Sequence, residues 1–392
     1  MPSRSTHALI AATVLTACLG TVPLAASPAW AVPATAVGSS TAPHSAPRLA
    51  DASAVLDPSD GAFRLSWSQR PGVRRVTVYA STRPQDPRVH GRRVAAVAVH
   101  GTSGSTVVTG LDPAQRWYFE LVPGNAAVGT ETAVRDITVP GADNVRDLGG
   151  YTTRDGRQVR WGTVFRAASL GGVTPAGDTV LAGLGLRQVL DFRSPTEIAA
   201  NGADRLPAGV ADVKLPIDTG DAGGSLGSLT PAQFAALFGN GQAAADMQQL
   251  YQQFVTSAAD RQQFGTALRT IADGGGSALL FHCSAGKDRT GWMSAVLLTA
   301  LGVPRSQVYS DFLLSNPELA ASNAALEAAL TQAGYDASLI TPLLTVQSSN
   351  LDTAFAEVKQ QYGSMDGYLT RGLGLNRHTL DALRARLLQP SS

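Results

Sequence analysis

Apolar and polar residues alternate along the chain from Asp51 to Pro140. Phe63, Leu65 and Trp67 fall on one face of an extended segment, and an alternation of the same period begins again at Val76. A period of two is typical of half-buried strands. Further strands are expected at 94–99, 106–108, 117–122 and 133–139. The regular spacing of these segments predicts an all-β sandwich over residues 51–140, with Trp67 and Trp117 in its core and Tyr118 facing outward.

From Gly141 to Ser392 the pattern changes, because strand-like runs now alternate with helical ones, as in an α/β domain. Apolar runs at 186–192 and 277–283 predict buried strands, and a helical stretch follows at 292–301. Thr230, a proline after it and Gln233 together predict the start of a helix. Two more helices are expected at 243–257 and 260–272. Because they lie between Asp218 and the strand entering Cys283, we expect them to form a helical cover over the site which that strand delivers.

The first 31 residues have the pattern of a secretory signal peptide. Arg4 precedes an apolar run from Ala8 to Gly20, and Ala29-Trp30-Ala31 supplies small residues at a cleavage site. The run is shorter than the ~20 residues that span a bilayer, so no transmembrane helix is expected. The protein is therefore predicted to be secreted. As an alternative, Leu15-Thr16-Ala17-Cys18 resembles a lipobox, which would leave a lipoprotein anchored through Cys18.

Residues 32–50 consist largely of Ala, Pro, Ser and Thr, and this composition predicts a flexible linker. Over the whole chain, 31 basic residues balance 30 acidic ones, which argues against a nucleic-acid-binding protein. Hydrophobic residues make up 44% of the chain, which excludes a disordered protein. With only Cys18 and Cys283 there is no disulfide framework, and cleavage after residue 31 would leave Cys283 as the sole thiol.

The run from His282 to Gly291 carries the chemistry, since it follows an apolar strand and leads into a helix. Five residues separate Cys283 from Arg289, enough to wrap backbone N–H groups around one tetrahedral phosphate. The positive end of the following helix lowers the pKa of a thiol in that field, so Cys283 is expected to be a nucleophilic thiolate. Arg289 presents a planar fork of donors to two phosphoryl oxygens. Thr290 is expected to hydrogen-bond the sulfur, and His282 to orient the loop through backbone groups.

This run resembles the Cys-x5-Arg phosphate loop of the protein tyrosine phosphatases. Its Gly-Lys-Asp-Arg-Thr-Gly ending resembles the atypical bacterial tyrosine or dual-specificity subgroup, which also acts on phosphoinositides and includes secreted members. Matching segments place the resemblance over about 140–380: 144–150, 164–166, 189–194, 368–369 and 372–375. The resemblance implies an α/β tyrosine phosphatase-like domain over 141–392 with a helical lid insertion. The segment 51–140 resembles a fibronectin type III domain through Trp67 and Leu111–Trp117.

Carried over residue by residue, the phosphatase resemblance makes Cys283 the nucleophile and places Lys287 and Asp288 at the pocket mouth. The phosphate-binding residues that it implies are Ser284, Ala285, Gly286, Lys287, Asp288, Arg289 and Thr290. A phenolate leaving group of pKa ~10 also needs a proton donor. Two candidates stay open: Asp288 in the loop itself, and Asp218 in Leu215-Pro216-Ile217-Asp218, about 65 residues before Cys283.

The expected function is a secreted, cysteine-dependent phosphatase without metal or cofactor. It would act on phosphotyrosine and also on phosphoserine, phosphothreonine and phosphoinositides, with a protein or glycan as the partner of the sandwich. Lys287, one of three lysines, favours substrates with a second phosphate. Asp191 and Arg193 either form a structural ion pair or line the site, and Asn144–Gly150 is interpreted as a turn that shapes the backbone. The alternatives are a phospho-ligand-binding or adhesion protein and a rhodanese-type sulfurtransferase.

Overall fold

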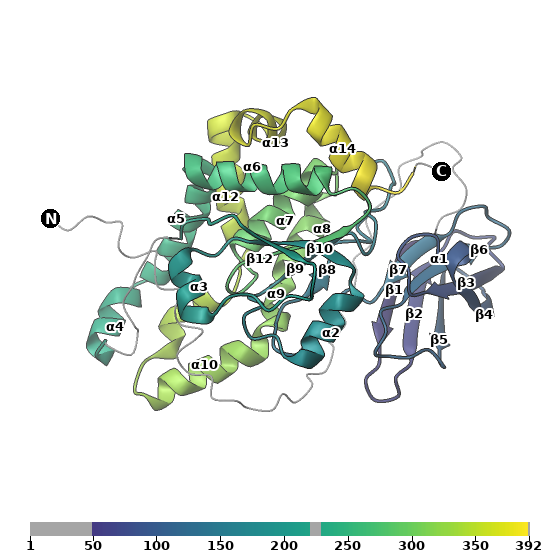
Figure 1. Ribbon diagram of the computed structural model, residues 1–392, viewed down its shortest axis with the longest axis horizontal. Helices are drawn as coiled ribbons and strands as arrows, with labels where there is room; N and C mark the ends of the chain where they lie inside the picture. Colours follow the sequence, from purple (N-terminus) through teal and green to yellow (C-terminus); the bar gives the residue numbers. More distant parts are fainter. Residues whose placement is uncertain (1–48, 220–228, 391–392) are drawn as a thin grey trace. The chain divides into compact units, whose positions relative to one another are not determined.

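A computed structural model of the chain describes residues 49–219 and 229–390. The predicted signal peptide, the possibility of lipidation at Cys18 and residues 32–48 of the predicted linker lie outside the described residues. The chain folds as two compact units (Figure 1). The first unit contains the described residues up to Leu111 and, in addition, Tyr118–Thr132. The second unit contains Asp112–Trp117 and the described residues from Ala133 onward.

The first unit contains two antiparallel sheets. The sheet of three strands has the order β1-β2-β5 and the sheet of four has the order β4-β3-β6-β7. The strands are β1 (Ala50–Leu56), β2 (Phe63–Ser68), β3 (Arg75–Ser81), β4 (Arg92–Ala98), β5 (Ser103–Val108), β6 (Tyr118–Pro123) and β7 (Thr130–Ala133), with the short helix α1 (Pro87–His90) between β3 and β4. The rings of Phe63 on β2 and Phe119 on β6 meet at 5.4 Å, which joins the two sheets in one core. Trp67 lies in this core, as predicted.

Four sequence-based expectations for this unit are wrong. Leu49 is buried and bonded to Thr130, and Ala50 already belongs to β1, so regular structure begins before residue 51. The strand expected at 133–139 is instead β7, which ends at Ala133. Tyr118 is buried rather than outward, because all six residues of β6 are buried and its faces do not alternate between core and solvent. Trp117 precedes β6 and is only half-buried, with its indole N–H donating to Asp112 O.

The second unit is built on a five-stranded sheet of order β11-β10-β12-β9-β8. Its strands are β8 (Arg146–Asp147), β9 (Val164–Ala167), β10 (Leu186–Asp191), β11 (Ala211–Lys214) and β12 (Ala278–His282). Four of them run parallel, and only β8 is antiparallel to its neighbour β9. β12 lies in the middle of this sheet, so both of its edges are hydrogen-bonded and its end is held firmly. The two apolar runs predicted as buried strands are confirmed as β10 and β12.

Helices surround this sheet. They are α2 (Pro175–Gly183), α3 (Pro195–Asn201), α4 (Pro231–Phe238), α5 (Gln242–Thr256), α6 (Ala258–Asp273), α7 (Arg289–Ala300), α8 (Arg305–Leu313), α9 (Ser315–Glu318), α10 (Ala320–Gln332), α11 (Thr341–Leu344), α12 (Ser348–Tyr362), α13 (Met365–Gly367) and α14 (Arg377–Leu387), with shorter turns η3 (Ala337–Ile340) and η4 (Tyr368–Gly372). The predicted start of α4 is confirmed, since Thr230 and Gln233 form a capping box. The helices expected at 243–257, 260–272 and 292–301 are confirmed as α5, α6 and α7.

Alternate residues of the central strands enter two different cores. Leu280 of β12 packs with Leu181 of α2 on one face, whereas Leu279 and Phe281 join the larger core of α5, α6, α7, α12 and α14 on the other. The sheet is therefore covered on both faces, as parallel sheets are. Among the described residues, no helix is both long and apolar enough to cross a bilayer.

Candidate active site

The loop from Cys283 to Asp288 joins the carboxyl end of β12 to the first residue of α7, Arg289. Carboxyl ends of parallel strands are where α/β sheets commonly bind ligands. Cys283 directly follows the strand and is only 2% exposed. The structure thus places the predicted loop residues together at one end of the central strand.

Four successive carbonyl groups of this loop are hydrogen-bonded on its outer side. His282 Nδ1 lies 3.0 Å from Cys283 O, and the Ser169 N–H donates to Ser284 O at 2.9 Å. The Asn144 side-chain amide donates to Ala285 O and Gly286 O, both at 3.0 Å. Arg166 adds a second bond to Gly286 O at 2.7 Å. With its carbonyls held outward, the loop turns its N–H groups to the inside.

The inner side of the loop is a ring of unused donors. Within the described chain, none of the backbone N–H groups from Ser284 to Asp288 donates to a protein acceptor. Gly286 has a φ of +66°, and a Cβ there would lie 2.2 Å from Ala167 O, so only glycine fits. Successive inward N–H groups form an anion-binding nest, and the N-terminus of α7 adds its positive dipole end.

Arg289 is buried and held by a bidentate ion pair. Its Nη1 and Nη2 each donate to a carboxylate oxygen of Glu197 at 2.6 Å. Nη1 also reaches Phe192 O at 3.1 Å and Ile217 O at 3.4 Å. Nε, in contrast, makes no hydrogen bond to a described residue, so the side face of the guanidinium stays available for phosphoryl oxygens.

Glu197 was not recognised from the sequence. It occupies the third position of α3, where it forms a capping box with Ser194, and it also accepts from the Ser284 hydroxyl at 2.6 Å. Burial raises its pKa, but the charge and hydrogen bonds of Arg289 outweigh burial and lower the pKa from 4.5 to about 2. A capping box is recognisable in the sequence Ser194-Pro195-Thr196-Glu197. This local pattern does not indicate that Glu197 also contacts Arg289.

Lys287 and Asp288, expected at the pocket mouth, differ in exposure, because Lys287 is buried and Asp288 is only partly buried. Lys287 is 5% exposed, and its Nζ lies 2.8 Å from Asp288 Oδ2 without hydrogen-bond geometry. The other carboxylate oxygen of Asp288 accepts from the hydroxyl of Tyr251, on helix α5, at 3.1 Å. Helix α5 thus contributes a buried side chain directly to the loop at Asp288.

Asp218 lies beside the same site despite its distance in sequence. The residue before it, Ile217, provides the carbonyl that Arg289 approaches. The Asp218 N–H donates to Asp260 Oδ1 at 3.2 Å, and its carbonyl accepts from Gln253 at 2.6 Å. The segment that follows β11 is therefore tied to α5 and α6, and the Asp218 side chain is exposed at the rim.

Thr290 and His282 have distinct surroundings. The hydroxyl of Thr290 is fully buried and has no hydrogen-bond partner among the described residues, so the expected bond to sulfur is not formed here. His282 orients the loop as predicted, through Cys283 O, and its Nε2 lies 2.9 Å from Asp204 Oδ2. Both nitrogens of this imidazole face oxygen atoms, which fixes the ring from two sides.

A buried ionic cluster supports the outer side of the loop. Asp311 pairs with Arg166 at 2.6 Å and Arg146 at 3.2 Å, and it accepts from the Tyr151 hydroxyl at 3.1 Å. Burial raises the pKa of Asp311, but the two arginines outweigh it and lower that pKa to about 2. Two guanidinium groups share one carboxylate, so a net positive charge lies behind the loop and favours an anion inside it. Asn144 has a φ of 58°, as the predicted backbone-shaping turn requires, and its amide also binds the loop.

Asp191 and Arg193 form the ion pair that the sequence suggested. Arg193 Nη2 lies 2.8 Å from Asp191 and 2.7 Å from Asp204. Lys214 Nζ reaches Asp191 at 2.8 Å. Within the part of the chain that the structure describes, Asp191, Asp204 and His282 are the one group with metal-ligand atoms close together, all within 4.8 Å. Because two basic side chains already balance these carboxylates, we assign the cluster to ion pairing and not to a metal.

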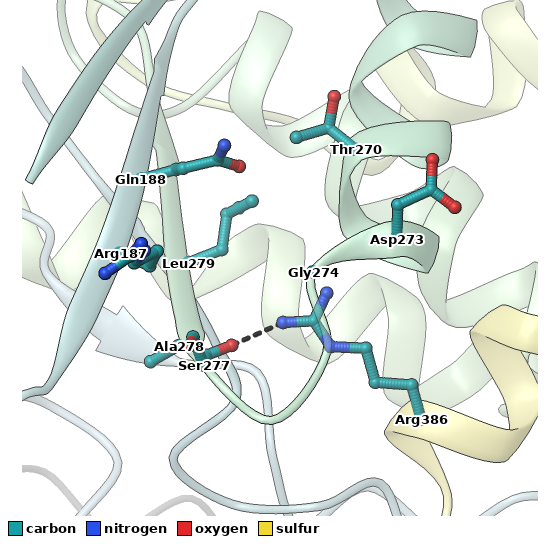
Figure 2. Close-up of a pocket in the computed structure, with 9 residues that line it drawn as sticks. All are labelled: Arg187, Gln188, Thr270, Asp273, Gly274, Ser277, Ala278, Leu279 and Arg386. Atoms are coloured by element: carbon teal, nitrogen blue, oxygen red, sulfur yellow. Dashed lines mark hydrogen bonds between the residues drawn. The ribbon is translucent and has the colours of Figure 1, made fainter.

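A second hollow, of about 380 Å³, lies at the opposite end of the sheet (Figure 2). It is lined by Arg187 and Gln188 of β10, Leu279 of β12, and Asp273, the last residue of α6. Arg386 reaches into it from α14 and donates to the carbonyls of Ile271 and Ser277. Because the hollow lies at the beginnings of β10 and β12 and the Cys283 loop follows the carboxyl end of β12, we do not assign the hollow to the active site.

Taken together, the site has a buried cysteine beneath a ring of inward N–H groups, with an oriented guanidinium and two carboxyl groups nearby. Such a site defines a protein that binds a tetrahedral oxyanion next to a thiol.

Comparison with known proteins identifies the class further. Residues 137–389 match the model of the tyrosine phosphatase family. The chain is 34% identical over 265 residues to a tyrosine-protein phosphatase of Cupriavidus necator, covering 64% of this chain and 89% of that one. It is 30% identical over 284 residues to the triple specificity protein phosphatase PtpB of Mycobacterium tuberculosis, covering 65% and 99%. A tyrosine-protein phosphatase of Nostoc commune is 26% identical over 241 residues, covering 57% and 74%. The chain belongs to the tyrosine phosphatase family and is a protein-tyrosine phosphatase.

Proposed function

We propose that the protein hydrolyses phosphomonoesters in two steps through a cysteinyl-phosphate on Cys283. The observation that carries this proposal is the loop with four carbonyls held outward and its N–H groups inward, directly after Cys283. Donors preorganised around a transferring phosphoryl group stabilise the charge that develops there, at little cost in reorganisation. The buried cluster of Arg146, Arg166 and Asp311 holds that geometry from behind.

In the first step the Cys283 thiolate attacks phosphorus while the bond from phosphorus to the ester oxygen breaks. Arg289 binds two phosphoryl oxygens through its side face, since Glu197 occupies the other face. The leaving oxygen takes a proton from the carboxyl group of Asp288. In the second step water attacks phosphorus, its proton passes to Asp288, and the sulfur departs. The Thr290 hydroxyl, which has no partner among the described residues, is well placed in the loop to bind that sulfur or a phosphoryl oxygen.

Asp288 is the proposed proton donor because its carboxyl belongs to the loop and is oriented by two neighbours, Tyr251 and Lys287. Asp218 remains the alternative, since Ile217 beside it contacts Arg289. Matched Asp→Asn variants at the two positions separate them. We expect the variant that lacks the donor to lose about 100-fold in turnover of an aryl phosphate with a poor leaving group. Full turnover in both variants would contradict a carboxyl donor altogether.

Phosphotyrosine is the proposed main substrate. Cys283 is only 2% exposed, so an ester must reach deep to meet it, and an aryl ester is longer than a phosphoserine side chain. The M. tuberculosis relative is named a triple specificity phosphatase, which supports testing phosphoserine, phosphothreonine and phosphoinositides as further substrates. Lys287 would bind a second phosphate only if it left Asp288.

We further propose that the chain is secreted and that helices α5 and α6 act as a lid. We also propose that the first unit is a fibronectin type III-like domain that binds a protein or glycan partner. The pattern of residues 1–31 supports export, although it lies outside the described residues. The packing of Tyr251 on the loop supports a lid, and the sheet orders β1-β2-β5 and β4-β3-β6-β7 support the domain type.

A panel of phosphate-release assays tests the function. It compares phosphotyrosine, phosphoserine and phosphothreonine peptides with phosphoinositides under reducing conditions, with Cys283→Ser as the control. We expect release from the phosphotyrosine peptide and none from the control variant. Tight binding of phosphate without turnover would favour a phospho-ligand-binding protein, and transfer of sulfur from thiosulfate would favour a sulfurtransferase.

A further inference from the structure

Tyr251 is held rigidly against the phosphate loop. It lies on α5 and is fully buried. Its ring packs edge-on against Phe254, with 5.3 Å between centroids, and against Phe312, with 6.1 Å. Phe312 in turn contacts the first turn of α7, because a Cβ at Gly291 would lie 2.8 Å from its ring. The ring of Tyr251 is therefore held by a neighbour on its own helix and by Phe312 of α8.

The carboxyl group of Asp288 has a different neighbour at each oxygen. Oδ1 accepts from the Tyr251 hydroxyl at 3.1 Å, and Oδ2 lies 2.8 Å from Lys287 Nζ. Asp288 is also the residue that precedes α7, where an aspartate usually caps the helix with its side chain. Here the side chain makes no capping hydrogen bond. The carboxyl group of Asp288 instead points toward Tyr251 and away from the N-terminus of α7.

This geometry restricts where Asp288 can carry a proton. A protonated carboxyl has one O–H, and an oxygen that accepts from a tyrosine hydroxyl does not also donate to it. Burial raises the pKa of Tyr251 well above its ordinary value, and the charge of Asp288 raises it further, so the hydroxyl stays a donor. The proton is thus confined to Oδ2. The Lys287 ammonium makes no hydrogen bond to any described residue. When the Asp288 carboxyl is neutral, the ammonium can therefore turn to the phosphoryl oxygens.

We propose that Tyr251 is a positioning residue that fixes the Asp288 carboxyl so that its proton lies on Oδ2, directed at the leaving oxygen. The inference rests on the proposed function, in which Asp288 is the proton donor. In the first step the bond from Oδ2 to hydrogen breaks and the proton joins the departing alkoxide or phenolate. The carboxylate left behind accepts from Tyr251 and faces Lys287, so the charge formed in that step is already compensated.

The test uses Tyr251→Phe, which removes the hydroxyl and keeps the ring in its packing. Two substrates are compared: phenyl phosphate, whose phenolate needs a proton, and 2,4-dinitrophenyl phosphate, whose phenolate leaves without one. We expect kcat/KM for phenyl phosphate, which reports the first step and not hydrolysis of the cysteinyl-phosphate, to fall about tenfold, the effect of losing one hydrogen bond to a charged group. For 2,4-dinitrophenyl phosphate we expect a change of less than about twofold. Inhibition by inorganic phosphate is expected to stay unchanged, because the loop itself is not altered.

Tyr309→Phe is the matched control. Its hydroxyl bonds Asp352 at 2.5 Å, so it loses a tyrosine–aspartate hydrogen bond of the same kind without touching the loop. It is expected to have wild-type kcat for both substrates. Circular dichroism and the urea midpoint of each variant confirm folding.

The outcomes separate the inference from the proposed function. An equal fall in kcat/KM for both substrates in Tyr251→Phe would mean a merely structural role, and no fall for either would mean no role; each overturns the inference. Asp288→Asn is measured in parallel. If it loses phenyl phosphate turnover while Tyr251→Phe does not, only the inference fails. If Asp288→Asn keeps full turnover, the proposed proton donor fails as well. In the Asp288→Asn background, Tyr251→Phe is expected to cause no further loss, and a further loss would contradict the coupling.

Discussion

Replacing Glu197 by glutamine removes the negative charge that holds Arg289 and keeps the size of the side chain. In the wild type both guanidinium ends of Arg289 donate to this carboxylate at 2.6 Å, and the Ser284 hydroxyl donates to it as well. The amide of glutamine offers one acceptor oxygen and places an NH2 group against a donor. Arg289 then remains buried without a counter-charge and without a fixed orientation.

The magnitude follows from the pKa of Glu197. The folded protein lowers it from 4.5 to about 2. A lowered carboxyl pKa contributes stability that is fully present above 4.5 and is lost as the pH falls toward 2. At about 1.36 kcal/mol per pKa unit, the contribution is about 3 kcal/mol at neutral pH and about 1.4 kcal/mol at pH 3. A loss of this order is also typical when one partner of a buried ion pair is removed, at about 3–5 kcal/mol.

The assay is urea denaturation of wild type and Glu197→Gln at pH 7 and at pH 3, followed by circular dichroism. Other carboxyl groups titrate equally in both proteins, so the difference between the two free energies of unfolding isolates position 197. We expect that difference to shrink by about half or more between the two pH values. At neutral pH, kcat/KM for phenyl phosphate is also expected to fall about 10-fold or more, since Arg289 is no longer oriented. A difference in stability that is equal at both pH values would refute the assignment of the lowered pKa to this ion pair.

Three other changes test separate parts of the site. Gly286→Ala adds a Cβ at 2.2 Å from Ala167 O and strains a φ of +66°, so we expect a loss of about 2 kcal/mol or more in urea denaturation and no detectable turnover. Arg166→Lys keeps a charge near Asp311 but cannot bind Asp311 and Gly286 O together, and we expect a weaker inhibition by inorganic phosphate, by about 10-fold, with a smaller change in stability. In a chain that begins at Val32, Cys283 is the sole thiol, and it is 2% exposed. We therefore expect a thiol-reactive disulfide to label it at least about 100-fold more slowly in the native protein than in urea. Labelling at equal rates would mean that the loop is open to solvent.

The phosphate loop was predictable because its signals are local. An apolar strand, a short run with Gly286 and a helix after Arg289 are readable within a dozen residues, and the structure forms β12, the loop and α7 there. The start of α4 was predictable for the same reason, since a capping box involves neighbours only. The catalytic roles of Cys283 and Arg289 stay proposals, and the structure places the two residues at opposite ends of this loop.

The groups that hold the loop were not predictable, because each comes from a distant segment. Asn144 lies 141 residues from Ala285, Arg166 lies 120 residues from Gly286, and Glu197 lies 92 residues from Arg289. Each belongs to a short run that also has a purely local explanation, as a turn, a strand or a helix cap. Nothing in one sequence distinguishes a carboxylate that caps its own helix from one that also binds an arginine elsewhere. The prediction that Tyr118 faces outward was wrong for a different reason. It assumed that alternate residues of the strand face solvent, whereas both faces of β6 are buried.

The contact between Tyr251 and Asp288 connects two features that the sequence presents as separate, a helical cover and a proton donor. Because the hydroxyl that orients Asp288 belongs to α5, the donor is fully arranged only when α5 lies on the loop. Cys283 is 2% exposed in this arrangement, and under the proposed function the substrate displaces part of the covering surface before it reaches the sulfur. Under the proposed function, the acid is therefore complete only when the cover lies over the bound ester. Water is then excluded at the moment when the phosphoryl group moves, which strengthens every interaction of the loop with the developing charge.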